Sequence, residues 1–322
     1  MSLLIQILVT VAFLIGVLGN VTALWILYKT ANRRNKKHLF LLRCLAVNDL
    51  IAQIGMLHFI YLGKYQGIPK YWNCVGFVLI RAFGLGSGCV AFVMAFERWL
   101  ALTRPFLYHQ IITYQVLKRF LCGLWLTAVI LTYLPLFGFG LYYNKEKDKC
   151  DRFRYAVDVK DKIYAYLFFA FGATLCICIA LCNIAVICEL LRIRSQQKVL
   201  VRRISRSIIV NRDRAGGPTR YHTPEEMAFA KLMAFICLIF IVCWAPQVIS
   251  VPVSQYFIPP SKSIKIFETV ADALLTVYFA LDPFVYVLQN YFEGRISFSC
   301  CFFKKSTSSL SSNTNDTEMV CL

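Results

Sequence analysis

The sequence predicts an all-α membrane protein: a seven-transmembrane helix bundle with a short C-terminal amphipathic helix. The chain is 58% hydrophobic and 16% charged, with a mean hydropathy of +0.60, whereas a soluble domain is about 45–50% apolar and about 25% charged. The apolar residues form seven runs, each near the roughly 20 residues that a helix needs to cross a bilayer. This composition excludes a disordered chain, a small secreted disulfide-rich protein and an ordinary cytosolic enzyme.

The helical bundle is expected over residues 1–290. A run such as Lys231 to Val251 is apolar on every side, unlike the shorter alternating strands of a membrane barrel. Backbone groups in lipid must be satisfied within their own segment, so each run is expected to be a helix. The expected spans are 5–28, 39–62, 75–98, 117–140, 164–191, 228–251 and 266–289.

The basic residues predict the orientation. The loops after spans 1, 3 and 5 and the C-terminal tail hold most of the 35 Lys and Arg residues, which places the N-terminus outside a plasma membrane and the tail in the cytoplasm. The net charge of +18 then reflects topology and attraction to anionic membrane lipids, and no nucleic-acid partner is expected. The first run lacks a basic leader, so its short outer end indicates a truncated start or insertion led by the first span.

Most of the 14 cysteines lie in spans or in cytoplasmic segments. Cys74, at the outer end of span 3, and Cys150, in the second outer loop, face an oxidising compartment and are expected to form a disulfide. The alternative is a pair of free thiols.

The C-terminal region divides in two. Residues 291–303 carry aromatic side chains among polar ones and predict an amphipathic helix on the membrane surface. Cys300 and Cys301 at its end are palmitoylation candidates, or remain free thiols. Residues 304–322 are predicted to be a disordered cytoplasmic tail whose Ser and Thr residues are open to kinases.

Polar residues inside the spans indicate a buried chamber, because a charge facing lipid costs about 2.5–3.5 kcal/mol. Asp49 in span 2, Ser87 in span 3 and Asp282 in span 7 are placed to converge with Asn20. Two carboxylates in low dielectric do not both ionise without a cation or water between them. A sodium ion or shared proton, and a hydrated hydrogen-bond cluster that packs the bundle, both remain open.

Glu97 and Arg98 lie at the cytoplasmic end of span 3, and Glu226 opens span 6 on the same side. An Arg98–Glu226 ion pair that breaks and re-forms would be a two-state latch. From these residues alone, interfacial charges that reach to water explain the pattern better.

Two prolines predict pivots in the last two spans. Pro246 follows Trp244 in span 6, and Pro283 precedes Tyr286 in span 7. Each proline removes a backbone hydrogen bond and bends its helix.

Together these motifs resemble the rhodopsin-like G-protein-coupled receptors over the whole chain. The motifs are Gly19-Asn20, Leu45 to Asp49, Cys74, Glu97-Arg98-Trp99, Trp125, Cys243 to Pro246 and Asp282 to Tyr286. The resemblance implies that Arg98 closes on an acid of span 6, at Glu226, and contacts a heterotrimeric G protein when released. It also implies sodium at Asp49 and Ser87, and kinases and arrestin at the tail. Trp99 and Asp282 replace the usual Tyr and Asn.

The ligand is expected to be a small prostanoid-like or other lipid mediator. Ile80 stands where amine receptors place an Asp, and span 7 has no Lys for a retinal Schiff base. The stretches at 97–108, 134–140, 182–187 and 281–288 resemble the prostanoid receptors.

A carboxylate ligand needs a cation, because an unpaired buried carboxylate is costly. Ala273 stands where the prostanoid receptors place an Arg, and residues 148–152 differ from their loop. Arg81 is the first candidate cation, with Lys64 and Lys265 behind it; the alternative is that Arg81 pairs with Asp272 or a loop acid. The aromatic residues that line a cavity, or simply pack the core, are Tyr61, Tyr65, Phe83, Trp244 and Tyr278.

The expected function is a receptor with no catalytic activity and no cofactor beyond an allosteric sodium ion. The alternatives are an intramembrane aspartyl-type protease and an ion or proton transporter, each using Asp49 and Asp282. The Val-Asn-Asp and Ala-Leu-Asp contexts lack the protease motifs, and no internal repeat typical of transporters is visible.

Overall fold

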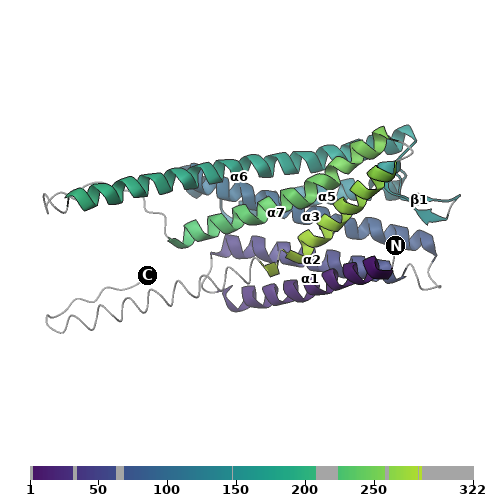
Figure 1. Ribbon diagram of the computed structural model, residues 1–322, viewed down its shortest axis with the longest axis horizontal. Helices are drawn as coiled ribbons and strands as arrows, with labels where there is room; N and C mark the ends of the chain where they lie inside the picture. Colours follow the sequence, from purple (N-terminus) through teal and green to yellow (C-terminus); the bar gives the residue numbers. More distant parts are fainter. Residues whose placement is uncertain are drawn as a thin grey trace.

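The computed structural model describes residues 3–31, 35–62, 69–146, 148–207, 224–257, 261–281 and 283–284 as a bundle of long helices along one axis (Figure 1). Its long helices are α1 (Leu3–Lys29), α2 (Lys36–Leu62), α3 (Lys70–Thr103), α5 (Tyr114–Tyr133), α6 (Val159–Ser207), α7 (Pro224–Tyr256) and a helix over 262–281. By length and hydropathy, six of those in the described ranges qualify as membrane spans. The helix over 262–281 completes the bundle.

Short elements connect the long helices. They are α4 (Pro105–Ile111), η2 (Leu134–Phe137), β1 (Tyr143–Asn144), β2 (Lys149–Cys150) and η3 (Phe153–Tyr155). Consecutive long helices run in opposite directions, and α1 begins at the end of the bundle that carries the β1–β2 hairpin (Figure 1). We call this the hairpin end; α3 ends at the opposite end.

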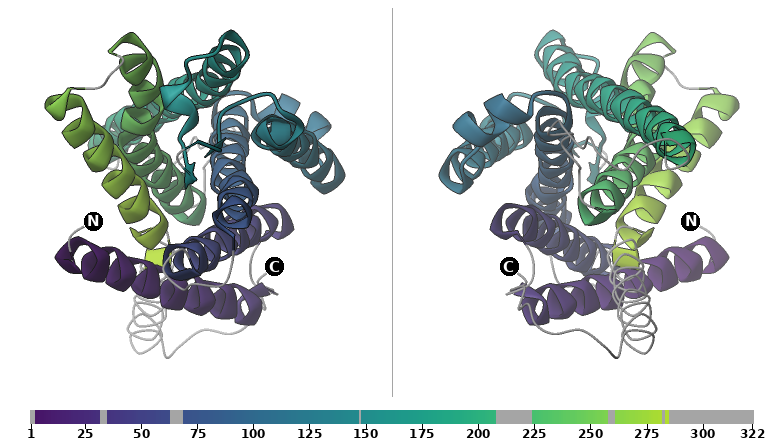
Figure 2. Two further views of the ribbon diagram at one scale, coloured as in Figure 1. Left: turned by 90° about the vertical axis from the view of Figure 1, so that its right-hand side faces the viewer. Right: turned by 90° about the vertical axis from the view of Figure 1, so that its left-hand side faces the viewer.

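The central helix is α3, which contacts α2, α5, α6 and α7 and lies inside the ring of helices when the bundle is seen along its axis (Figure 2). Its small residues permit close approach. A Cβ atom on Gly86 would overlap the Trp125 indole of α5. The buried core follows α3 through residues such as Leu85, Val90 and Met94, so one apolar core joins the helices.

Large apolar side chains also cover the outside of the bundle. Leu8 is 60% exposed, and Trp25, Ile177 and Val242 are each more than half exposed. A soluble monomer rarely exposes apolar surface on this scale, whereas a bilayer solvates it.

Turn residues set the ends of α5. Thr113 caps its start by accepting a hydrogen bond from the Val116 amide at 3.3 Å. The apolar run continues to residue 140, but the α-helix ends at Tyr133, and Pro135 lies in the following 3-10 turn. Gly138 has a φ of 85°, a left-handed conformation that glycine adopts without a Cβ penalty.

Each of the seven predicted spans overlaps one long helix, so the helix-bundle fold is confirmed. The helices extend beyond the apolar runs where polar turns continue the same backbone pattern, as α6 does to Ser207. The amphipathic helix at 291–303, the tail at 304–322, and Cys300 and Cys301 lie outside the described residues and stay predictions.

Candidate ligand-binding and signalling sites

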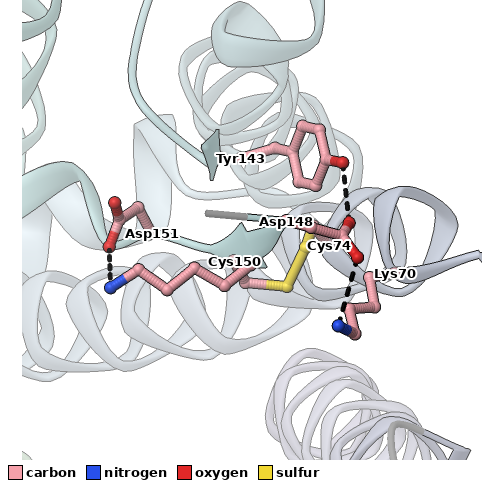
Figure 3. Close-up of a disulfide and its surroundings, with 7 residues drawn as sticks. Lys70, Cys74, Tyr143, Asp148, Cys150 and Asp151 are labelled. Atoms are coloured by element: carbon pink, nitrogen blue, oxygen red, sulfur yellow. Dashed lines mark hydrogen bonds and ion pairs between the residues drawn. A yellow bond between two sulfur atoms is a disulfide. The ribbon is translucent and has the colours of Figure 1, made fainter. Parts of the chain in front are cut away.

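The predicted disulfide is present between Cys74 of α3 and Cys150 of β2, with their Cα atoms 5.3 Å apart. Figure 3 shows that polar contacts hold the hairpin around it. Asp148 accepts a hydrogen bond from the Tyr143 hydroxyl at 2.9 Å and pairs with Lys70 Nζ at 3.1 Å. These two donors lower the pKa of Asp148, so its carboxylate stays ionised and keeps the hairpin attached to the start of α3.

The loop beyond Cys150 is fastened to the last two helices. Gln255 Nε2 of α7 donates to the carbonyl oxygens of Arg154 and Ala156 at 2.9 and 3.2 Å. Asp272 of the helix over 262–281 accepts from Arg152 Nη1 at 2.5 Å and from Arg154 Nη2 at 3.3 Å. The loop therefore lies fixed across the hairpin end.

Glu268, one helix turn before Asp272, is 5% exposed. It accepts hydrogen bonds from the Tyr155 hydroxyl and from Ser254 Oγ, the latter at 2.5 Å. Burial and the hydrogen bond to Glu268 raise the pKa of Tyr155 to about 12. The phenol therefore keeps its proton and remains a donor at neutral pH.

Sequence reasoning missed this outer network, although two signals were available. Glu268 and Asp272 are spaced i, i+4 and so share one helix face, and Arg154 follows Cys150 by only four residues.

Arg81 of α3 lies beneath this loop, with its guanidinium carbon 4.9 Å from the Phe153 ring centroid. Its Nη1 is buried and has no hydrogen-bond partner among the described residues. Asp272, the partner considered for it, is instead bonded to Arg152 and Arg154.

The other candidate ligand residues are dispersed. Tyr61 bonds Thr10 of α1 at 2.8 Å, and Phe83 packs edge-on against Trp125 at 5.6 Å between centroids. Trp244 and Tyr278 both pack on Phe240 in the core, and Lys265 is exposed. Lys64 and Tyr65 lie outside the described residues.

The polar centre joins four helices through two groups of contacts. Ser87 Oγ donates to Asp49 Oδ1 at 2.5 Å, linking α3 to α2, and both side chains are fully buried. Asn20 Nδ2 of α1 donates to Gln53 Oε1 at 3.4 Å, and Gln53 Nε2 donates to the Phe279 carbonyl. Gln53 was missed, although it follows Asp49 by one helix turn on the same face. Asp282 lies outside the described residues.

At the opposite end of the bundle, Arg98 is 6% exposed and is held by its neighbour Glu97, whose Oε2 lies 2.6 Å from Arg98 Nε. Glu97 Oε1 accepts from the Tyr108 hydroxyl at 2.6 Å and lies 3.4 Å from His38 Nε2, which also contacts Arg98. These contacts therefore hold the Arg98 side chain at the end of α3. The Glu226 side chain and Tyr286 are not among the described parts, so the Arg98–Glu226 latch stays a prediction.

The two proline sites have different surroundings. Pro246 lies inside α7 near Trp244, whose ring stacks on Phe240 at 5.1 Å between centroids. Pro283 packs against Gly19 of α1, where an added Cβ atom would lie 2.7 Å from Pro283 Cγ. Whether either helix pivots there stays a prediction.

A bundle of apolar helices with a buried polar centre and a disulfide-bonded loop across one end defines a multi-pass membrane protein. The profile of the family described as "7 transmembrane receptor (rhodopsin family)" matches residues 19–286. The chain belongs to this family, the G-protein-coupled receptors that its motifs resemble. It is therefore a receptor and not an enzyme, and the protease and transporter alternatives are excluded.

The relatives place this chain near prostanoid receptors within the family. It is 26% identical over 309 residues to the prostacyclin receptor of Homo sapiens, covering 91% of this chain and 75% of that protein. It is 25% identical over 257 residues to a Gq-coupled rhodopsin of Mizuhopecten yessoensis, covering 77% of this chain but only 49% of the rhodopsin. The squid rhodopsin structure shares the fold, with a TM-score of 0.67 and 16% identity over 87% of this chain and 75% of that one.

Proposed function

We propose that this protein is a plasma-membrane receptor for an extracellular lipid mediator of prostanoid-like type, and that it signals through a heterotrimeric G protein. The observation that carries this proposal is Arg81, an interior cation that lies against Phe153 and has an unpartnered Nη1 among the described residues. A guanidinium that lies against an aromatic ring and has a buried donor atom favours an amphipathic anion over an amine. The similarity to a prostacyclin receptor supports the same ligand class.

The proposed orientation puts the hairpin end outside the cell and Arg98 inside. A disulfide forms and persists in an oxidising compartment, which supports an extracellular position for Cys74 and Cys150. Ligand binding at the outer half would favour a state in which α7 swings about Pro246 and Arg98 becomes available to the G protein. The ligand can shift this equilibrium only by its differential affinity for the two states.

A sodium ion is proposed as an allosteric ligand of the polar centre. The Asp49 carboxylate and Ser87 hydroxyl are hard oxygen donors, which sodium prefers, and Asn20 Oδ1 is a buried oxygen with no hydrogen-bond partner in the described part of the chain. Replacing NaCl by KCl should raise agonist affinity in the wild type and leave Asp49→Asn unchanged. An equal response in both proteins would remove the ion from the proposal.

The function is tested by nucleotide exchange on purified G proteins, with the receptor in lipid nanodiscs. The probes are prostaglandins, neutral lipid amides, biogenic amines and peptides. Exchange stimulated by lipids alone is expected. Exchange driven only by an amine or a peptide would refute the proposed ligand class, and no exchange with any heterotrimer would refute the coupling.

A further inference from the structure

Among the described residues, Arg154 is the most deeply buried cation of the hairpin end. It is 2% exposed, and its Nη2 lies 3.3 Å from Asp272 Oδ1. With the Gln247 amide in the orientation that satisfies its neighbours, Gln247 Oε1 accepts from the same Nη2 at 2.8 Å. Arg154 Nε and Nη1 have no hydrogen-bond partner among the described residues. Two of the three guanidinium nitrogens are therefore unused, although they face different edges.

The acids near Arg154 are already engaged. Asp272 is shared with Arg152, whose Nη1 lies 2.5 Å from Oδ2. Glu268 accepts from two hydroxyl groups. Arg81 adds a third guanidinium, which the charges of Arg152 and Arg154 repel.

Asp272 pairs with Arg152 and Arg154, and no ion pair between Arg81 and an acid is present among the described residues. The three arginines therefore exceed the two carboxylates by one positive charge. An uncompensated charge in a buried site is costly, and a bound anion removes that cost.

Apolar side chains adjoin the two inner arginines. Phe153 contacts Arg81 and packs with Tyr164, Phe168 and Val251 in a buried cluster between the loop, α6 and α7. An anion that enters here meets hydrocarbon and aromatic surface next to the guanidinium groups. A carboxylate on a long apolar chain fits a site that has guanidinium groups next to apolar side chains, whereas a small hydrophilic anion does not.

The loop holds Arg154 in place before any ligand arrives. Gln255 bonds the carbonyl of Arg154 itself, and the Cys74–Cys150 disulfide fixes the chain four residues earlier. Because little backbone freedom remains to be lost, binding to this residue costs little ordering entropy.

We propose that Arg154 of the second outer loop, together with Arg81, binds the carboxylate of a lipid ligand, and that each arginine donates from a nitrogen that has no partner among the described residues. This assignment rests on the proposed lipid-receptor function. It supplies a cation in place of the Arg that the prostanoid receptors carry at the position of Ala273. A carboxylate has two oxygens, so it can accept one charge-assisted hydrogen bond from each of the two guanidinium groups.

The test compares prostaglandin E2 with its methyl ester, which keeps the chain and lacks the charge. Potency is measured by nucleotide exchange in wild type, Arg154→Gln and Arg81→Gln. Arg152→Gln is the matched control, because Arg152 pairs with the same Asp272 but its side chain is 50% exposed. The measured quantity is the acid-to-ester potency ratio within each variant. A lower amount of folded receptor affects both potencies alike and therefore cancels in the ratio.

We expect Arg154→Gln and Arg81→Gln each to reduce that ratio about tenfold or more, as for loss of a buried charge-assisted hydrogen bond. Arg152→Gln should change it less than about fivefold, as for an exposed ion pair. If Arg154→Gln fails to reach the membrane, Arg154→Lys replaces it. It should lower the ratio by a smaller factor, since the ammonium keeps the charge but lacks the planar donor geometry of the guanidinium.

Failure of this site is distinguishable from failure of the proposed function. An unchanged ratio in Arg154→Gln, or activation by the ester and neutral lipid amides equal to that by the acid, overturns the carboxylate site while the lipid receptor stands. If lysophosphatidic acid activates the receptor and the lipid carboxylates do not, the carboxylate assignment is overturned in favour of a phosphate. If no lipid activates the wild type, both proposals fall.

Discussion

Replacing Tyr108 by Phe should raise the ligand-free activity of the receptor. The change deletes one hydroxyl group, which donates to Glu97 Oε1 at 2.6 Å in a site where Glu97 is 1% exposed. Glu97 in turn holds Arg98. A hydrogen bond to a charged group contributes about 1.5–3 kcal/mol, which corresponds to about 10- to 150-fold in an equilibrium constant.

If this bond exists only in the restrained state, its loss shifts the resting equilibrium toward release of Arg98 by that factor. We therefore expect basal nucleotide exchange to increase about tenfold or more, up to the rate of the fully active receptor. The assay is GDP–GTP exchange on a purified heterotrimer with ligand-free receptor in nanodiscs.

Tyr114→Phe is the matched control. Tyr114 begins α5 near the same end of the bundle, and its ring packs edge-on against Phe40 at 5.4 Å between centroids. Basal exchange of the control should equal that of the wild type. Equal basal exchange in Tyr108→Phe and wild type, with both proteins folded, would refute the restraint of Arg98 through Glu97.

Three further predictions concern the two ends of the bundle. Arg98→Ala should abolish nucleotide exchange while changing ligand affinity less than about threefold; retained exchange would refute its role in coupling. Cys150→Ser should lower the thermal unfolding temperature and weaken ligand binding, because the bond closes a segment of 76 residues and fixes the loop; wild-type binding under reducing conditions would contradict this. The pKa of Asp148 is lowered in the folded protein, so its contribution to hairpin stability should be complete above about pH 4 and decline as the pH falls further. Hydrogen exchange of the hairpin amides as a function of pH measures this, and Asp148→Asn should show no such decline.

Several features of the candidate sites could be predicted from single residues. Cys74 and Cys150 were identifiable because only they combine a thiol with a position that the charge pattern predicts to be outside. Asp49 and Ser87 were identifiable because a polar group in an apolar span must find a partner inside the bundle, and the two do bond each other. The pairing of Glu97 with Arg98 follows from their adjacency at the end of α3.

Other contacts were beyond sequence reasoning. Gln53 bonds the Phe279 carbonyl, 226 residues away in the chain, and Arg154 bonds Asp272 across 118 residues. No spacing rule connects such positions, because they meet only where separate helices and loops pack against one another. Phe83 and Tyr61 illustrate the same limit: their spans were predicted, but which neighbour each faces depends on the rotation of its helix.

The amino-acid sequence alone determined the helical spans, the disulfide pair and the receptor family. These are set by hydropathy over about 20 residues and by motifs within a turn or two of helix, and both act locally along the chain. The tertiary structure alone decided that Arg154 lies buried beside Asp272 and that Gln53 joins α1, α2 and the helix over 262–281. Burial and charge balance depend on every element packed around a group, so they are properties of the assembled bundle.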